Sequence, residues 1–207
     1  GEMITIRTWD VGGDKPLAFL PQASEANPFL GERGLRTMRR VPDLFADQLR
    51  AIVLAGRRTP VRVMFPMVTE PAEVVWAREI LASVVRELDA EPIPVGIMVE
   101  VPAAAVRASD FVDLIDFASI GTNDLTQYTT ATDRGNGVVA HLARADAPAV
   151  LDLIAMTCAA LAPTPVAVCG DLASDTTMTG TLISLGVSEL SVRAPLVGLV
   201  KQAVRRA

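Results

Sequence analysis

Two carboxylates follow two apolar segments of the chain, and their spacing suggests a site for a divalent cation. Glu100 follows the segment VGIMV at residues 95–99, and Asp124 lies shortly after FASI at residues 117–120. Segments that are apolar at consecutive positions are typical of parallel strands covered by helices on both faces. The carboxyl ends of such strands lie on one side of a sheet, so Glu100 and Asp124 are predicted to face the same mouth. Two carboxylates suit Mg²⁺, which keeps several waters and takes further ligands from substrate oxygens.

Each carboxylate taken singly also has a simpler interpretation. Asp and Glu are common at helix N-termini, where they accept backbone N–H groups and complement the helix dipole. Arg134, ten residues after Asp124, favours a binding site over a pair of helix caps.

The ends of the predicted strands also collect cations and an amide. Arg7 lies near the end of the first apolar segment, Arg33 follows a short one, and Asn123 precedes Asp124. Guanidinium groups present paired planar donors to phosphate and carboxylate, so Arg7, Arg33 and Arg134 suit a dianionic phosphate plus a carboxylate. Surface ion pairs are the usual fate of arginine, and only the common location at strand ends favours a site.

The cysteines and the histidine are assigned different roles. Cys169 ends the strand-like segment PVAVC beside Gly170, where we interpret it as a general acid for a reacting carbon. A small buried thiol is the default for a free cysteine, and Cys158, on an apolar helix face, is given that role. His141 is expected to be a solvated surface residue.

The elements that must position these residues alternate between strand and helix. Strand-like segments occur at residues 3–8, 27–31, 61–67, 95–99, 117–120, 165–169 and 189–192. Helical periodicity occurs at residues 42–56, 71–88, 150–161, 176–185 and 196–204, with a short helical spacer before residue 117 and a polar loop after residue 120. In the last helix the buried residues are predicted to be Leu196, Leu199, Val200, Ala203 and Val204.

This alternation predicts a parallel α/β fold, for which two architectures compete. A doubly wound sheet would carry a G-x-G-x-x-G fingerprint after its first strand, and this chain has none. A TIM (β/α)8-type barrel places polar residues at the ends of several strands, as this sequence does. The barrel is therefore favoured, although it has eight strands and the sequence offers seven candidates.

Composition excludes several classes of protein. Lys and Arg number 19 against 24 Asp and Glu, a net charge of −5, which argues against a sequence-independent nucleic-acid surface. No apolar segment has the length of a membrane span and no signal pattern opens the sequence, so a membrane partner is not expected. The two cysteines lack metal-ligand spacing and predict free thiols in a reducing, cytoplasmic location.

The run SIGTNDLTQY…DRGN, with GIMVEVPAAA before it, resembles the signature of the phosphoenolpyruvate (PEP)-utilising enzymes. Its DRGN ending is most similar to enzyme I of the bacterial sugar phosphotransferase system, and further matching blocks begin at RTWDVGGDK. The resemblance implies that residues 1–207 are a single, partial PEP-binding barrel that lacks its first strand. It also implies that an N-terminal phosphohistidine domain is absent from this sequence.

The resemblance further implies an activity and residue roles. In enzyme I, PEP passes its phosphoryl group to a histidine of a separate N-terminal domain, and the enolate is protonated to pyruvate. Matching by motif makes Glu100 and Asp124 the Mg²⁺ ligands and Cys169 the proton donor. The same matching makes Arg7, Arg33, Asn123 and Arg134 the substrate-binding residues. A homodimer is implied, whereas the phosphocarrier protein would bind only through the absent N-terminal domain.

Two alternatives remain open, and one residue departs from the family pattern. A magnesium-dependent aldolase or lyase acting on pyruvate enolates also uses strand-end Glu, Asp and Arg, although the GTNDLTQY…DRGN block and Cys169 speak against it. The chain could also act only as a binding and dimerisation module. Asp171 stands where the family usually has Glu after Cys-Gly, and the shorter side chain is expected to shift that loop slightly.

Overall fold

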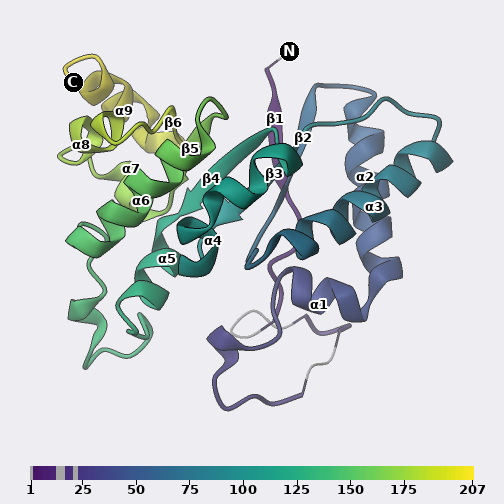
Figure 1. Ribbon diagram of the computed structural model, residues 1–207, viewed down its shortest axis with the longest axis horizontal. Coiled ribbons are helices and arrows are strands. Elements are labelled where there is room, and N and C mark those ends of the chain that lie inside the picture. The colour runs from purple at the N-terminus through teal and green to yellow at the C-terminus, as the bar shows by residue number, and fades with distance from the viewer. Residues whose placement is uncertain (1, 13–16, 21–22) are drawn as a thin grey trace. The chain divides into compact units, whose positions relative to one another are not determined.

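The computed structural model describes residues 2–12, 17–20 and 23–207, which divide into two compact units, residues 1–97 and 98–207. The elements of both units are labelled in Figure 1. In the described part of the chain, no helix combines the length and apolar character that crossing a bilayer would need.

The first unit is built on parallel strands that pair in chain order. Strand β1 (Ile4–Arg7) pairs with β2 (Val61–Phe65), and β2 pairs with the start of β3 (Val95–Val99). The side chains of β2 alternate between buried and half-buried, whereas every residue of β3 is buried. The predicted strands at residues 3–8, 61–67 and 95–99 are therefore confirmed.

Helices α2 (Pro42–Gly56) and α3 (Pro71–Glu87) pack against each other in this unit, and α2 also packs on β2. Both begin at a proline, whose fixed φ suits the first turn of a helix. A capping box between Glu70 and Glu73 closes the N-terminus of α3. The shorter helix α1 (Leu35–Arg40) was not predicted.

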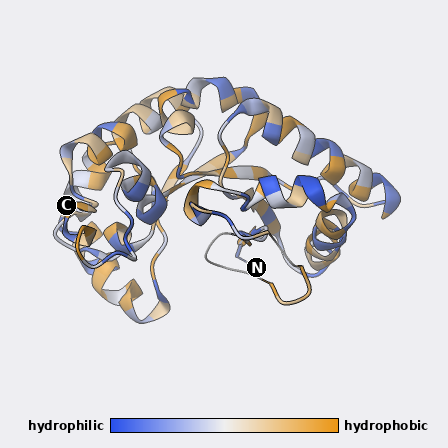
Figure 2. Ribbon diagram, turned by 90° about the horizontal axis from the view of Figure 1, so that it is seen from below, coloured by the Kyte–Doolittle hydropathy of each residue, from blue (hydrophilic) through white to orange (hydrophobic). Residues whose placement is uncertain are grey.

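The second unit repeats the strand–helix alternation. Strand β4 (Phe117–Gly121) pairs in parallel with β5 (Val166–Cys169), which pairs with β6 (Glu189–Leu190). Its helices are α4 (Pro102–Val106), α5 (Thr122–Thr129), α6 (Pro148–Leu161), α7 (Asp171–Ser174), α8 (Thr179–Ser184) and α9 (Val197–Val204). Figure 2 shows hydrophilic and hydrophobic residues alternating along the helices, as expected where one face is buried and the other solvated.

Within each unit, every strand pairs with the next strand in the sequence, and all of these pairs are parallel. A doubly wound sheet would reverse its strand order at a switch point, whereas a (β/α) barrel does not. The fold is thus α/β, a partial TIM-like barrel with six strands in the described part of the chain. The predicted barrel class is confirmed.

Several predicted elements were wrong. The segment at residues 27–31 is not a strand, because Pro28–Leu30 form a 3₁₀ turn closed by a hydrogen bond from the Leu30 N–H to the Asn27 carbonyl. The polar loop after residue 120 is the helix α5, whose polar residues are largely buried. In α9 only Val200 is buried, while Leu199 and Val204 are exposed, so the predicted apolar face is mostly solvated.

Candidate functional site

The end of β3 and the end of β4 meet closely in the second unit. Glu100 follows β3 and is only 1% exposed. Its carboxylate lies against Gly121, the last residue of β4, where an added Cβ would stand 2.6 Å from Glu100 Oε2. Glu100 is not the cap of the next helix, since α4 begins after Val101. The Glu100 carboxylate is thus held beside the N-terminus of α5, the helix that carries Asp124.

Two further contacts join the ends of β4 and β5. The Thr122 hydroxyl donates to the Cys169 carbonyl at 2.7 Å, and the Asp171 N–H donates to Asn123 Oδ1 at 3.1 Å. Between them lies Gly170, with a φ of +91° that favours glycine, and a Cβ there would stand 2.5 Å from Thr122 Oγ1. This crowding fixes the loop after Cys169 against the first turn of α5.

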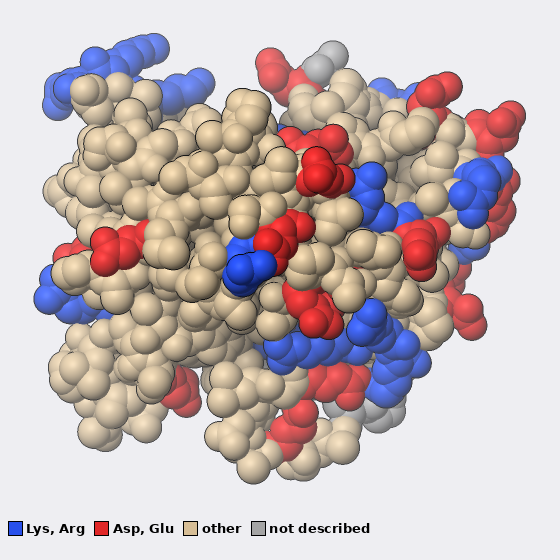
Figure 3. Space-filling model, viewed as in Figure 1, with Lys and Arg blue, Asp and Glu red and all other residues tan. Residues whose placement is uncertain are grey.

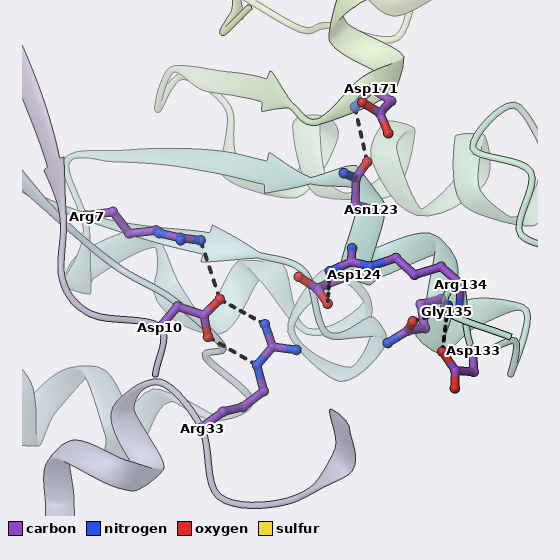
Figure 4. Close-up of polar contacts among 10 residues, drawn as sticks. Arg7, Asp10, Arg33, Asn123, Asp124, Asp133, Arg134, Gly135 and Asp171 are labelled. Carbon is purple, nitrogen blue, oxygen red and sulfur yellow. Dashed lines mark hydrogen bonds and ion pairs between the residues drawn. The ribbon is translucent and has the colours of Figure 1, made fainter. Parts of the chain in front are cut away.

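Asp124 and Arg134 form an ion pair across the site. Asp124 is buried in the first turn of α5, and its Oδ1 lies 3.8 Å from an Nη atom of Arg134, whose side chain is about one-third exposed. Figure 4 shows the Arg134 side chain extending back from its loop toward Asp124. An aspartate and an arginine placed in this way can bind a cation and an anion side by side.

Cys169 is half-buried at the end of β5, and its Sγ lies 3.5 Å from the Ile120 carbonyl. By contrast, Cys158 lies buried on α6, where burial raises the pKa of its thiol to about 11. Cys158 is thus the small buried thiol that was expected, whereas the role of Cys169 as a general acid stays a prediction.

The first unit holds the other two predicted arginines around one carboxylate. Arg33 donates from Nε to Asp10 Oδ1 at 3.1 Å and from Nη2 to Asp10 Oδ2 at 2.8 Å. Arg7 lies 3.6 Å from the same carboxylate, and the three side chains point toward one another in Figure 4. The Arg33 and Asp10 side chains are almost fully buried, whereas that of Arg7 is 39% exposed.

The seven predicted site residues thus fall into two groups. The first unit contains Arg7 and Arg33, and the second contains Glu100, Asn123, Asp124, Arg134 and Cys169. Sequence reasoning did not single out Asp10 and Thr122, which hydrogen-bond to the predicted residues Arg33 and Cys169. The only signal for Asp10 was its place in RTWD, three residues after Arg7; residues 13–15 of the RTWDVGGDK block lie outside the described residues.

The donor set fits some metals better than others. Among the described residues, no group of three or more His, Cys, Asp or Glu side chains comes together as a metal site. A structural zinc site needs four such ligands. Glu100 and Asp124 are two buried carboxylates of the second unit, and Mg²⁺ is commonly held by one or two carboxylates plus substrate oxygens.

The comparison with known proteins identifies the family. Residues 1–207 match the family described as "PEP-utilising enzyme, PEP-binding domain". This chain belongs to that family. The resemblance inferred from SIGTNDLTQY…DRGN is therefore confirmed over the full length of the sequence.

Relatives of this PEP-binding domain occur within longer proteins. The chain is 46% identical over 207 residues to a multiphosphoryl transfer protein of Rhodobacter capsulatus, covering 99% of this chain and 25% of that protein. It is 43% identical to a phosphoenolpyruvate-protein phosphotransferase of Haloferax volcanii and 40% identical to one of Latilactobacillus sakei. These matches cover 99% and 100% of this chain but 38% and 37% of the relatives. The chain thus spans between a quarter and two-fifths of these relatives.

A solved structure supports the fold alone. A citrate lyase from Burkholderia xenovorans LB400 matches with a TM-score of 0.60 and 18% identity, over 77% of this chain and 53% of the lyase. The similarity is consistent with a barrel-type α/β fold and carries no argument about activity.

Proposed function

We propose that this PEP-binding domain binds PEP together with Mg²⁺ as the substrate domain of a PEP–protein phosphotransferase. In the complete protein, the phosphoryl group of PEP would pass to a histidine of another domain, with release of pyruvate, as the first step of sugar uptake. The supporting observation is the approach of the Glu100 carboxylate to Gly121 at the start of α5, the helix that carries Asn123 and Asp124.

The proposed roles follow from charge and placement. Glu100 and Asp124 would hold Mg²⁺, which neutralises charge on phosphate and carboxylate oxygens when it is bound. Arg7, Arg33 and Arg134 would bind the anionic groups of PEP, since guanidinium forms paired, charge-assisted hydrogen bonds with phosphate and carboxylate. Asn123 would contact the phosphate through its backbone.

Cys169 would protonate the methylene carbon of the enolate. In that step the thiol S–H bond breaks, a C–H bond forms at the methylene carbon, and pyruvate and a thiolate result. This role is supported by the position of Cys169, a half-buried residue at the end of β5.

We also propose that the protein forms a homodimer, is located in the cytoplasm and has no nucleic-acid partner. In Figure 3 the charged side chains gather mainly on the right of the view, where basic and acidic groups lie next to one another, so this face offers no extended field of one sign to a polyanion.

Calorimetric titration of the 207-residue chain with PEP, with and without Mg²⁺, tests this proposal. PEP should bind, and Mg²⁺ should strengthen binding in the wild type but not in Asp124→Ala. Asp113→Ala is the matched control, because Asp113 is exposed on the 3₁₀ segment Ala108–Leu114 of the same unit. Failure of the wild-type chain to bind PEP, or unchanged Mg²⁺ dependence in Asp124→Ala, would overturn the proposal.

A further inference from the structure

Gln127 lies on α5, one turn after Asp124, and is only 4% exposed. Its Oε1 accepts a hydrogen bond from the backbone N–H of Arg134 at 3.1 Å. Helix α5 therefore contacts both the backbone and the side chain of Arg134. Gln127 binds its backbone N–H, and Asp124 lies beside its guanidinium group. The two contacts come from positions three residues apart, which lie on the same face of a helix.

The orientation of the Gln127 amide is set by this contact, because a backbone N–H needs an acceptor opposite it. The amide nitrogen, Nε2, is buried and has no hydrogen-bond partner in the part of the chain that the structure describes. A buried donor without a partner destabilises a protein. The hydrogen bond from the Arg134 N–H to Oε1 is therefore the only one that the Gln127 side chain makes in the described part of the chain.

The segment that leads to Arg134 has other contacts with α5, but these are made by residues 130 and 132. The Thr130 N–H and hydroxyl donate to the Thr126 carbonyl at 2.9 Å and 2.8 Å, and the Thr132 N–H donates to the Gln127 carbonyl at 3.0 Å. The ion pair between Asp124 and Arg134 is long, at 3.8 Å, and one of its partners is partly exposed. Such a pair fixes a flexible arginine only weakly.

We propose that Gln127 is a positioning residue that sets where the Arg134 guanidinium lies and thereby the affinity for the anionic group that Arg134 binds. This inference rests on the proposed function, since the ligand of Arg134 is taken to be PEP. Gln127 itself does not touch the substrate. Its effect passes through the backbone of residue 134.

Two substitutions of Gln127 separate this role from a general packing role. Gln127→Met keeps the length of the side chain but replaces the amide oxygen with a thioether, a weak acceptor. Gln127→Glu keeps an oxygen acceptor for the Arg134 N–H but adds a negative charge at a buried position one turn from Asp124, so this variant tests protection of the N–H and not PEP affinity. PEP affinity should fall about tenfold in Gln127→Met, the order expected for one buried hydrogen bond.

A double-mutant cycle with Arg134→Ala shows whether Gln127 acts through Arg134. In the Arg134→Ala background, Gln127→Met should cause no further loss of PEP affinity. The inference is overturned if Gln127→Met binds PEP like the wild type, or if it weakens binding equally in both backgrounds. If the wild-type chain binds no PEP at all, the proposed function fails first and this inference fails with it.

Amide hydrogen exchange gives a readout that needs no substrate. The Arg134 N–H should be protected in the wild type and in Gln127→Glu, and should exchange faster in Gln127→Met. Should Gln127→Met not fold, Gln127→Asn serves as the second variant, because its amide is one methylene shorter and cannot reach residue 134. Equal protection of the Arg134 N–H in every folded variant would overturn the inference.

Discussion

The carboxylate of Glu100 occupies the space where a side chain on Gly121 would begin. A Cβ atom at residue 121 would stand 2.6 Å from Glu100 Oε2 and 2.9 Å from Met98 Cε, closer than side-chain atoms approach, and 3.0 Å from Glu100 Cβ, which is a tight contact. The backbone of Gly121, with φ −84° and ψ 84°, does not itself require glycine. Any larger residue here would have to displace the Glu100 carboxylate and the end of the Met98 side chain.

The first prediction concerns this contact. Gly121→Ala should displace Glu100, lower stability by about 1–3 kcal/mol through overpacking, and remove the effect of Mg²⁺ on PEP binding. Thermal unfolding and calorimetric titration measure the two effects. Gly137→Ala is the control, because nothing lies within 4 Å of a Cβ at that position. If PEP binding by Gly121→Ala kept the Mg²⁺ dependence of the wild type, Glu100 would not be a ligand of the proposed metal site.

The second prediction concerns the buried pair of Arg33 and Asp10. Asp10→Asn should destabilise the fold by about 3–5 kcal/mol, because it removes the charge that neutralises a buried guanidinium. The control is Asp146→Asn, in the exposed pair of Arg144 and Asp146, where the change should be about 1 kcal/mol or less. Urea unfolding of both variants makes the comparison, and equal losses would show that burial of the first pair has no energetic consequence.

The parts of the fold that the sequence predicted have regular periodicity and clear boundaries. Helix α2 was predicted at residues 42–56 and is found there, because Pro42 begins it, Gly56 ends it, and apolar residues recur on one face between them. Strands β3 and β4 were predicted because continuous apolar residues suit strands buried on both faces.

Helix α5 was missed for a reason that is itself informative. Its sequence TNDLTQYT is polar, and this polarity was interpreted as a loop. In the structure Thr122, Asp124, Thr126 and Gln127 are all buried, so the polar residues face the interior of the unit. A polar helix with a buried polar face carries no apolar stripe for a periodicity argument to detect.

Contacts between residues distant in sequence were not predicted. Asp10 and Arg33 are 23 residues apart, and Asn123 and the Asp171 N–H are 48 apart. Spacing along one sequence cannot reveal such pairs, whereas the proposed site residues were chosen from strand ends and family motifs. Whether these residues perform the proposed chemistry is what the binding experiments test.

The third prediction concerns the relative reactivity of the two thiols. Burial raises the pKa of Cys158 from 9.0 to about 11, because the thiolate loses its solvation. At about pH 8 roughly one molecule in a thousand would carry the Cys158 thiolate, which is the reactive form. Iodoacetamide labelling followed by peptide mass spectrometry should therefore modify the half-buried Cys169 well before Cys158. Faster labelling of Cys158 would contradict the burial found on α6.

The last prediction concerns the proposed proton donor in the complete phosphotransferase. A positioned general acid contributes typically about 10²–10⁴-fold to the rate of the step that it serves. Replacing Cys169 by Ala should slow pyruvate formation by a factor in this range while leaving the binding of PEP and its Mg²⁺ dependence unchanged, because the proposed ligands of both lie on other residues. Cys158→Ala, which removes a buried thiol remote from any proposed role, should leave the rate near that of the wild type. Pyruvate release measured for the two variants decides between the roles: a near wild-type rate in Cys169→Ala would show that water or another group supplies the proton.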